Sequence, residues 1–370
     1  MDFLFITGWP KGEGTGGLNE FAFNKETGEL THLRTIDENV AFGTAFAGKE
    51  PGILYAVNEK SGPDGGNVYT YKVDPKNGDI RLLGITSTLV ANPAYLGVDK
   101  TGKYAVVADH STNDAGVKVE LGDDGKYHPV VYRNDAIVAL FGINGDGSLG
   151  GLCDVSIHEG SSIGKRQDMP HPHCAVFSPD GSLIAVCDKG TDYVHMYTID
   201  EEQGRLKEVT KWKETPGYMP RYAAFHPTKP FFYHNNEGNA IVSAYSYDEK
   251  AVFTQIGEFC AAPNSWDGKV EQQGLCIHPS GKYLYDCVKG PEAITVFEID
   301  QENGSLKKIQ SLLSDYMWIR TVQTSPDGRF LCATYKDSDK AVIYEINERG
   351  MLEETGIECD CIRAAGIAFM

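Results

Sequence analysis

Residues 169–181 read Met-Pro-His-Pro-His-Cys-Ala-Val-Phe-Ser-Pro-Asp-Gly: two histidines, a short apolar run and a proline-containing turn. The same order of a polar start, an apolar run and a turn recurs at residues 220–227, 273–281 and 320–328. Short apolar runs that are bounded by turn residues predict β-strands. The chain is therefore expected to contain an internal repeat that begins with such a strand.

The spacing of these segments predicts the fold. The prolines of the four turns, Pro179, Pro227, Pro279 and Pro326, are separated by 48, 52 and 47 residues. Each unit has room for four short strands, for example at 174–178, 183–187, 193–199 and 206–212. A second signature recurs at 21–30, 71–80, 197–206 and 297–306. It starts with Phe or Tyr and ends with a glycine, one further residue and then Leu or Ile. Counting both signatures gives seven units, which predicts an all-β, seven-bladed β-propeller with four antiparallel strands per blade.

The ends of the chain and one long unit complete this prediction. Residues 3–7 resemble a second strand and residues 362–369 a first strand, so the C-terminal strand is expected to join the N-terminal blade and close the ring. Because no linker or change of composition divides the sequence, residues 1–370 are predicted to form one propeller domain. The third unit is about thirty residues too long for this repeat, and the excess near 111–135 is interpreted as an added hairpin or a plain surface excursion.

Composition limits the class of partner. Of the 370 residues, 52 are acidic and 34 are Lys or Arg, which gives a net charge of -18 and argues against nucleic-acid binding. No apolar run has the length of a membrane span. The nine cysteines form no CxxC pair, and a cytoplasmic location is the simplest interpretation. No cluster has metal-ligand spacing, so no metal and no cofactor are predicted. The glycine-rich stretch 12–17 lacks the Lys-Ser/Thr of a phosphate loop and is predicted to be a simple loop.

Two sets of equivalent positions point to a site. Strands one and two of a blade form a hairpin, so the start of one and the end of the other lie at the same mouth of the central channel. The first set is Gly43, Ala94, His173, Arg221, Gln273, Arg320 and Arg363, and the second is Glu59, His110, Lys189, Glu237, Lys289 and Lys336. Ten of these thirteen side chains can carry charge although the strands between them are apolar. Their convergence predicts a binding site for a small anionic ligand.

Several of these segments resemble the hallmark sequences of a known family. The run from Gly164 to Gly181, the segment 220–227 and the Asn-Asn-Glu at 235–237 are similar to those of the seven-bladed lactonases. That family includes propeller-type 6-phosphogluconolactonases and 3-carboxy-cis,cis-muconate cyclases. The resemblance covers essentially the whole chain and is more specific for the family than for a substrate.

The resemblance implies a site of one histidine, one arginine and one glutamate, which fall here on His173, Arg221 and Glu237. A further basic residue, often arginine in the family, is Lys289 here, and Lys binds anions as a point charge rather than as a two-pronged donor. Asp109 and His110 stand where the family often has an aromatic residue, so the pocket wall at this point differs.

The residue types suggest roles. His173 is a candidate general base or acid, and Glu237 is the alternative base. Arg221 is expected to bind an anionic group or the oxyanion, or to brace the blade by pairing with Glu237. The expected substrate contacts are His171, Lys289, Arg320 and Arg363. The predicted function is hydrolysis of a sugar lactone such as 6-phosphogluconolactone. The alternatives are a cycloisomerase acting on a carboxymuconate-type substrate and a propeller that only binds a ligand or protein.

Overall fold

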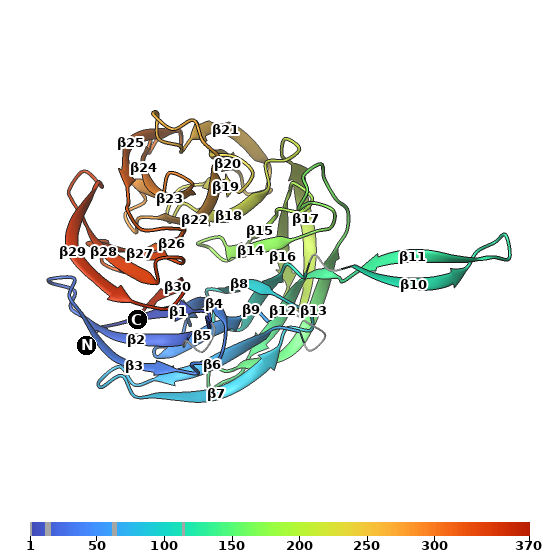
Figure 1. Ribbon diagram of the computed structural model, residues 1–370, viewed down its shortest axis with the longest axis horizontal. Coiled ribbons are helices and arrows are strands. Elements are labelled where there is room, and N and C mark those ends of the chain that lie inside the picture. The colour runs from blue at the N-terminus through green and yellow to red at the C-terminus, as the bar shows by residue number, and fades with distance from the viewer. Residues whose placement is uncertain (1, 12–15, 61–64, 113–114) are drawn as a thin grey trace.

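The computed structural model describes residues 2–11, 16–60, 65–112 and 115–370. These residues form thirty β-strands and no helix, and so contain no helix that could cross a membrane. Twenty-eight of the strands make seven four-stranded antiparallel sheets that surround a central axis (Figure 1). The predicted seven-bladed propeller is therefore confirmed. Residues 12–15 of the glycine-rich stretch lie outside the described residues.

Each blade starts at the axis and proceeds outward, and the blades follow one another along the chain. The inner strand of blade one is β30 (Ala364–Phe369), followed by β1 (Asp2–Gly8), β2 (Gly17–Phe23) and β3 (Leu30–Ile36). Blade two comprises β4 (Phe42–Ala47), β5 (Ile53–Asn58), β6 (Asn67–Val73) and β7 (Ile80–Ser87). Blade three comprises β8 (Pro93–Val98), β9 (Tyr104–Asp109), β12 (Ala136–Ile143) and β13 (Leu149–His158). Blade four comprises β14 (Pro172–Phe177), β15 (Ile184–Asp188), β16 (Tyr193–Asp200) and β17 (Arg205–Lys213). Blade five comprises β18 (Pro220–Phe225), β19 (Phe231–Asn236), β20 (Ile241–Tyr247) and β21 (Phe253–Cys260). Blade six comprises β22 (Glu271–Ile277), β23 (Tyr283–Lys289), β24 (Ala293–Ile299) and β25 (Leu306–Leu313). Blade seven comprises β26 (Ile319–Thr324), β27 (Phe330–Tyr335), β28 (Lys340–Ile346) and β29 (Leu352–Asp360).

The core lies between neighbouring blades. Second strands such as β5 and β27 are buried along their whole length because they are packed on both faces, whereas the outer strand β7 has only half-buried and exposed positions. Phe23 and Phe369 of blade one pack against Phe330 of blade seven, with the rings of Phe23 and Phe330 edge-on at 5.8 Å. This apolar contact joins the first and last blades.

The C-terminal strand closes the ring as predicted. β30 pairs antiparallel with β1, with Leu4 opposite Phe369 and Ile6 opposite Ile367. Residues from the two ends of the chain thus share one sheet, and the inner edge of blade one is covered.

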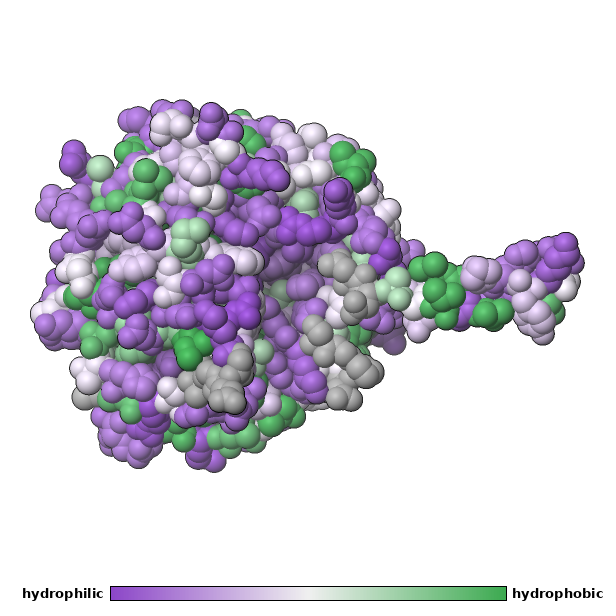
Figure 2. Space-filling model, in the orientation of Figure 1, coloured by the Kyte–Doolittle hydropathy of each residue, from purple (hydrophilic) through white to green (hydrophobic). Residues whose placement is uncertain are grey.

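The long third unit contains the predicted hairpin. Strands β10 (Ala115–Leu121) and β11 (Tyr127–Arg133) pair with each other in a separate two-stranded sheet that projects from the ring (Figure 1). Apolar side chains cover part of its surface (Figure 2), and Val117 and Tyr127 are 65% and 74% exposed. We call residues 115–133 the arm.

Replacing the arm by a short glycine-serine linker is expected to change the melting temperature (Tm) by no more than about 2 °C, because a lone hairpin adds little stability. Its strands pair only with each other among the described residues, and its ion pair between Arg133 and Asp168 is partly exposed. Thermal unfolding followed by circular dichroism measures the effect. A large fall in Tm would show that the arm supports the third blade.

Candidate active site

The predicted positions meet at one mouth of the channel. Arg320, near the start of inner strand β26, lies 3.4 Å from Glu59, which follows the second strand β5 of blade two. It also lies 3.4 Å from Gln273 of the neighbouring inner strand β22. Gly43 leaves the space that Glu59 fills, since a Cβ at Gly43 would lie 1.9 Å from Oε1 of Glu59. This arrangement follows from the repeat, because equivalent positions of a propeller converge on its axis.

Arg221 and Glu237 form a buried ion pair at the centre of this group. Both come from blade five, at the start of β18 and directly after β19, and their side chains are 5% and 3% exposed. Nε of Arg221 lies 2.7 Å from Oε2 of Glu237, but its N–H is not aimed at the oxygen, so the contact is an ion pair rather than a hydrogen bond. Glu237 also contacts Nζ of Lys189 at 3.1 Å and Nη1 of Arg166 at 2.9 Å. Three cations therefore surround one carboxylate.

This crowding sets the charge of the group. Burial alone would raise the pKa of Glu237, but Lys189, Arg221 and Arg166 overcome it and hold the pKa far below its usual value. Burial and the neighbouring guanidinium of Arg320 lower the pKa of Arg221. Nη1 of Arg221 is buried and has no hydrogen-bond partner in the part of the chain that the structure describes. A buried cationic donor without a partner is suited to an anionic ligand.

His173 lies beside this group at the start of β14. Its ring stacks on His110 at a centroid distance of 5.7 Å and contacts the ring of Tyr222 at 5.2 Å. Burial, together with the charges of Arg221 and Lys189, holds the pKa of His173 well below its usual value. Nδ1 is buried without a partner among the described residues, so His173 is a neutral imidazole with free hydrogen-bonding capacity.

His171 is held more tightly than His173. Its Nδ1 donates to the carbonyl of His110 at 2.6 Å, and its backbone N–H donates to Asp188 at 2.7 Å. Nε2 is fully buried without a partner in the described ranges. These contacts are those of a residue that supports the segment before His173.

An aromatic wall lies on the other side of the mouth. Nζ of Lys289 lies 3.7 Å from the ring centroid of Trp318, and Nζ of Lys336 lies 3.9 Å from the same ring. The guanidinium of Arg363 lies 5.5 Å from the ring of Trp9. Burial, followed by Arg363 and Arg320, lowers the pKa of Lys336 to about 8. Lys289, Arg320 and Arg363 are thus placed around the mouth, although Lys289 is paired with Glu271 at 2.9 Å.

Comparison with known proteins agrees with this architecture. Residues 3–369 match the family model described as "Lactonase, 7-bladed beta-propeller". The chain belongs to this lactonase family. A 6-phosphogluconolactonase of Bacillus subtilis is 24% identical over 92% of this chain and 90% of its own length. A 6-phosphogluconolactonase of Formosa agariphila is 27% identical over 91% of each chain. The solved periplasmic gluconolactonase of Pseudomonas aeruginosa has the same fold, with a TM-score of 0.88 at 22% identity over 100% of this chain and 99% of its own.

Three side chains of this candidate site are absent from the sequence prediction. Trp9 directly follows β1 just as Glu59 directly follows β5. It therefore occupies in blade one the position that Glu59 holds in blade two, a position for which the predicted sets contain no residue of blade one. Trp318 lies two residues before Arg320, where blade four has His171. Arg166 comes from the loop before β14, and no repeat position indicates it. Aligning strand ends would have revealed Trp9 but not Arg166.

The opposite half of the channel has a different character. A cavity of about 360 Å³ is lined by all seven inner strands and has no Asp, Glu, Lys or Arg among its described lining residues. Tyr95 and Tyr222 line the cavity, pack edge-to-face at 5.8 Å, and Tyr222 also contacts His173. The cavity offers no charge to hold an anion, so the charged mouth is the better candidate site of this lactonase-family chain.

Proposed function

We propose that the protein hydrolyses a sugar lactone that carries an anionic group, with 6-phosphogluconolactone as the leading candidate. The observation that carries this proposal is the buried Nη1 of Arg221, which has no hydrogen-bond partner among the described residues and lies inside a ring of cations, in a chain of the lactonase family. The cations of the mouth are Arg166, Lys189, Arg221, Lys289, Arg320, Lys336 and Arg363. The net charge of the molecule is -18, which repels anions, so these cations are needed to attract an anionic substrate to the mouth.

Each step of the reaction has a suitable group. A water molecule attacks the lactone carbonyl, and His173 takes its proton because the imidazole is neutral and its Nδ1 has no partner in the described part of the chain. Arg221 stabilises the negative charge that develops on the carbonyl oxygen. The bond from the carbonyl carbon to the ring oxygen then breaks, and the protonated His173 returns the proton to that oxygen. The product is an open hydroxy acid.

Glu237 fits a positioning role better than that of a base. Both of its oxygens lie in ion pairs, Oε1 with Arg166 and Oε2 with Lys189 and Arg221, so neither oxygen is free to take a proton from water. Its carboxylate instead fixes Arg221 and Lys189 in the mouth. Between the two bases that the sequence leaves open, these contacts favour His173.

The pH dependence of catalysis follows from His173. Its pKa lies well below 6.5 because of burial and neighbouring cations, and the neutral form is the active one. We therefore expect kcat to stay constant as the pH falls from 8 through 6.5 and to decline only in more acidic solution, after correction for spontaneous hydrolysis. A decline centred near 6.5 would contradict a buried neutral base.

The function is tested by a panel of substrates. Hydrolysis of 6-phosphogluconolactone, corrected for spontaneous opening, is compared with that of the uncharged gluconolactone and with cyclisation of a carboxymuconate. We expect the phosphorylated lactone to have the highest kcat/KM, since the mouth is cationic. Faster loss of the conjugated dienoate would favour the cycloisomerase, and no acceleration of any substrate would favour a binding protein.

We also propose that the enzyme acts in the cytoplasm. All nine cysteines are free, which suits a reducing compartment. Cell fractionation with antibodies against the protein tests this location, and recovery from the periplasm would overturn it.

A further inference from the structure

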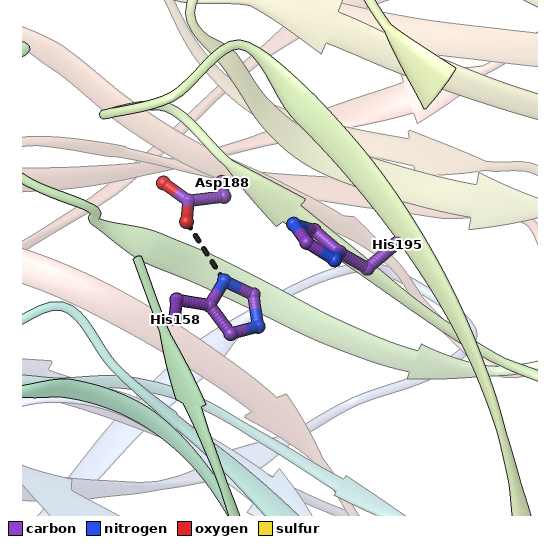
Figure 3. Close-up of side chains that lie close together, drawn as sticks. All are labelled: His158, Asp188 and His195. Atoms are coloured by element: carbon purple, nitrogen blue, oxygen red, sulfur yellow. Dashed lines mark hydrogen bonds and ion pairs between the residues drawn. The ribbon is translucent and has the colours of Figure 1, made fainter. Parts of the chain in front are cut away.

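Two histidines and an aspartate lie together between the third and fourth blades. His158 ends β13, Asp188 ends β15 and His195 lies in β16, and all three side chains are buried. Figure 3 shows the two imidazole rings and the carboxylate facing one another. One ligand atom from each residue lies within 4.8 Å of the other two. The sequence shows no metal-ligand spacing, because these residues belong to three different strands of two blades.

The outer nitrogen of each imidazole already has a partner. Nδ1 of His195 donates to Oε2 of Glu208 at 2.7 Å. The other ring nitrogen, Nε2, therefore carries a lone pair that can bind a metal ion. Nε2 of His158 lies 3.0 Å from the hydroxyl of Tyr197, which lies 3.1 Å from the hydroxyl of Ser156. Histidines that bind metals usually have their other ring nitrogen held by a carboxylate or another oxygen. Both histidines therefore have the outer contacts of metal ligands.

We propose that His158, Asp188 and His195 bind a divalent transition-metal ion of the zinc type, outside the charged mouth. Two imidazoles and one carboxylate form a nitrogen and oxygen donor set that suits such ions. Bonds of about 2.0–2.2 Å place the ligand atoms of a tetrahedral site roughly 3.4 Å apart. A movement on the order of 1 Å is therefore enough to bring the three atoms to this spacing.

The proton balance allows binding without a change of charge on the histidines. Without metal, Nδ1–H of His158 donates to Oδ2 of Asp188 at 2.7 Å. When the ion takes both atoms, the proton of His158 moves to Nε2, which then donates to Tyr197. Tyr197 in turn donates to Ser156, so that the hydrogen bonds of this chain reverse direction. His195 keeps its proton on Nδ1, facing Glu208.

The site is joined to the segment that carries His173. Oδ1 of Asp188 accepts the backbone N–H groups of His171 at 2.7 Å and Gly190 at 3.0 Å. An ion on Oδ2 would leave these bonds in place and fix the carboxylate that holds them. Binding is therefore expected to raise the Tm.

The test uses the tag-free full-length protein, stripped with a chelator and titrated with Zn²⁺ by calorimetry. We expect one ion per chain and a higher Tm in the presence of Zn²⁺. Co²⁺ should bind at the same site and give visible absorption bands of a nitrogen and oxygen ligand set. His195→Gln should remove this binding, and Glu208→Gln, which keeps all three ligands, should weaken it by about 10- to 100-fold.

His128→Gln is the matched control. His128 and Asp124 form an exposed pair at 2.9 Å on the arm and belong to no three-ligand group within the described ranges, so this change should leave the stoichiometry and affinity unaltered. The proposal is overturned if the wild type binds no stoichiometric ion. It is also overturned if both His195→Gln and Glu208→Gln bind Zn²⁺ as the wild type does. If His195→Gln fails to fold, the affinity of Glu208→Gln decides alone.

Discussion

Replacing His173 with Gln is expected to lower kcat for lactone hydrolysis by about 10²- to 10⁴-fold, the range that a general base contributes. Gln has a similar size but cannot take the proton of the attacking water. Nδ1 of His173 makes no hydrogen bond within the described ranges, so its loss leaves no polar group at that position without a partner. The Tm should therefore change little, and kcat should fall more than KM rises. Steady-state kinetics together with thermal unfolding measure both effects.

His278→Gln is the matched control for this change. His278 lines the uncharged cavity in the other half of the channel and contacts Ser280 and the carbonyl of Gly328. Its replacement should leave kcat unchanged if the substrate binds at the charged mouth. If His278→Gln loses activity while His173→Gln keeps it, the site lies at the opposite mouth.

The sequence was sufficient to predict the propeller because its strands repeat with a regular period. The turn prolines and the glycine signature place the same strand at the same position in each blade, and hydrophobic alternation fixes which side chains face the core. Equivalent positions then had to meet at the axis. For this reason Arg221, Glu237 and Arg320 could be assigned to one mouth without a structure.

Contacts between blades and from loops could not be predicted in this way. Arg166 reaches Glu237 from an irregular loop, and repeat positions carry no information about its direction. The group of His158, Asp188 and His195 depends on how far two neighbouring blades approach each other. The sequence also leaves open whether Glu237 is a base or an ion-pair partner, since that depends on how many cations surround it.

Replacing Glu237 with Gln is expected to lower the free energy of unfolding by about 3–5 kcal/mol at pH 7, the cost of breaking a buried ion pair. Arg221 is 5% exposed and the side chain of Lys189 is 14% exposed, so neither cation can recover its hydration when the carboxylate is removed. Chemical denaturation of the wild type and the variant measures the difference. The matched control is Glu358→Gln, which breaks an exposed pair with Lys340 at 2.6 Å and should cost about 0–1 kcal/mol.

The difference between wild type and Glu237→Gln should depend on pH with a defined sign. The pKa of Glu237 in the folded protein lies far below the ordinary value of 4.5, because Lys189, Arg221 and Arg166 outweigh its burial. Its contribution to stability is therefore complete above about pH 4.5 and decreases as the pH falls toward the folded-state pKa, since the unfolded chain then binds a proton that the folded one does not. The gap between the two proteins should narrow below pH 4.5 and stay constant between pH 6 and 8. A gap that does not change down to pH 3, or a variant as stable as the wild type at pH 7, would mean that the carboxylate does not hold the cations of the mouth together.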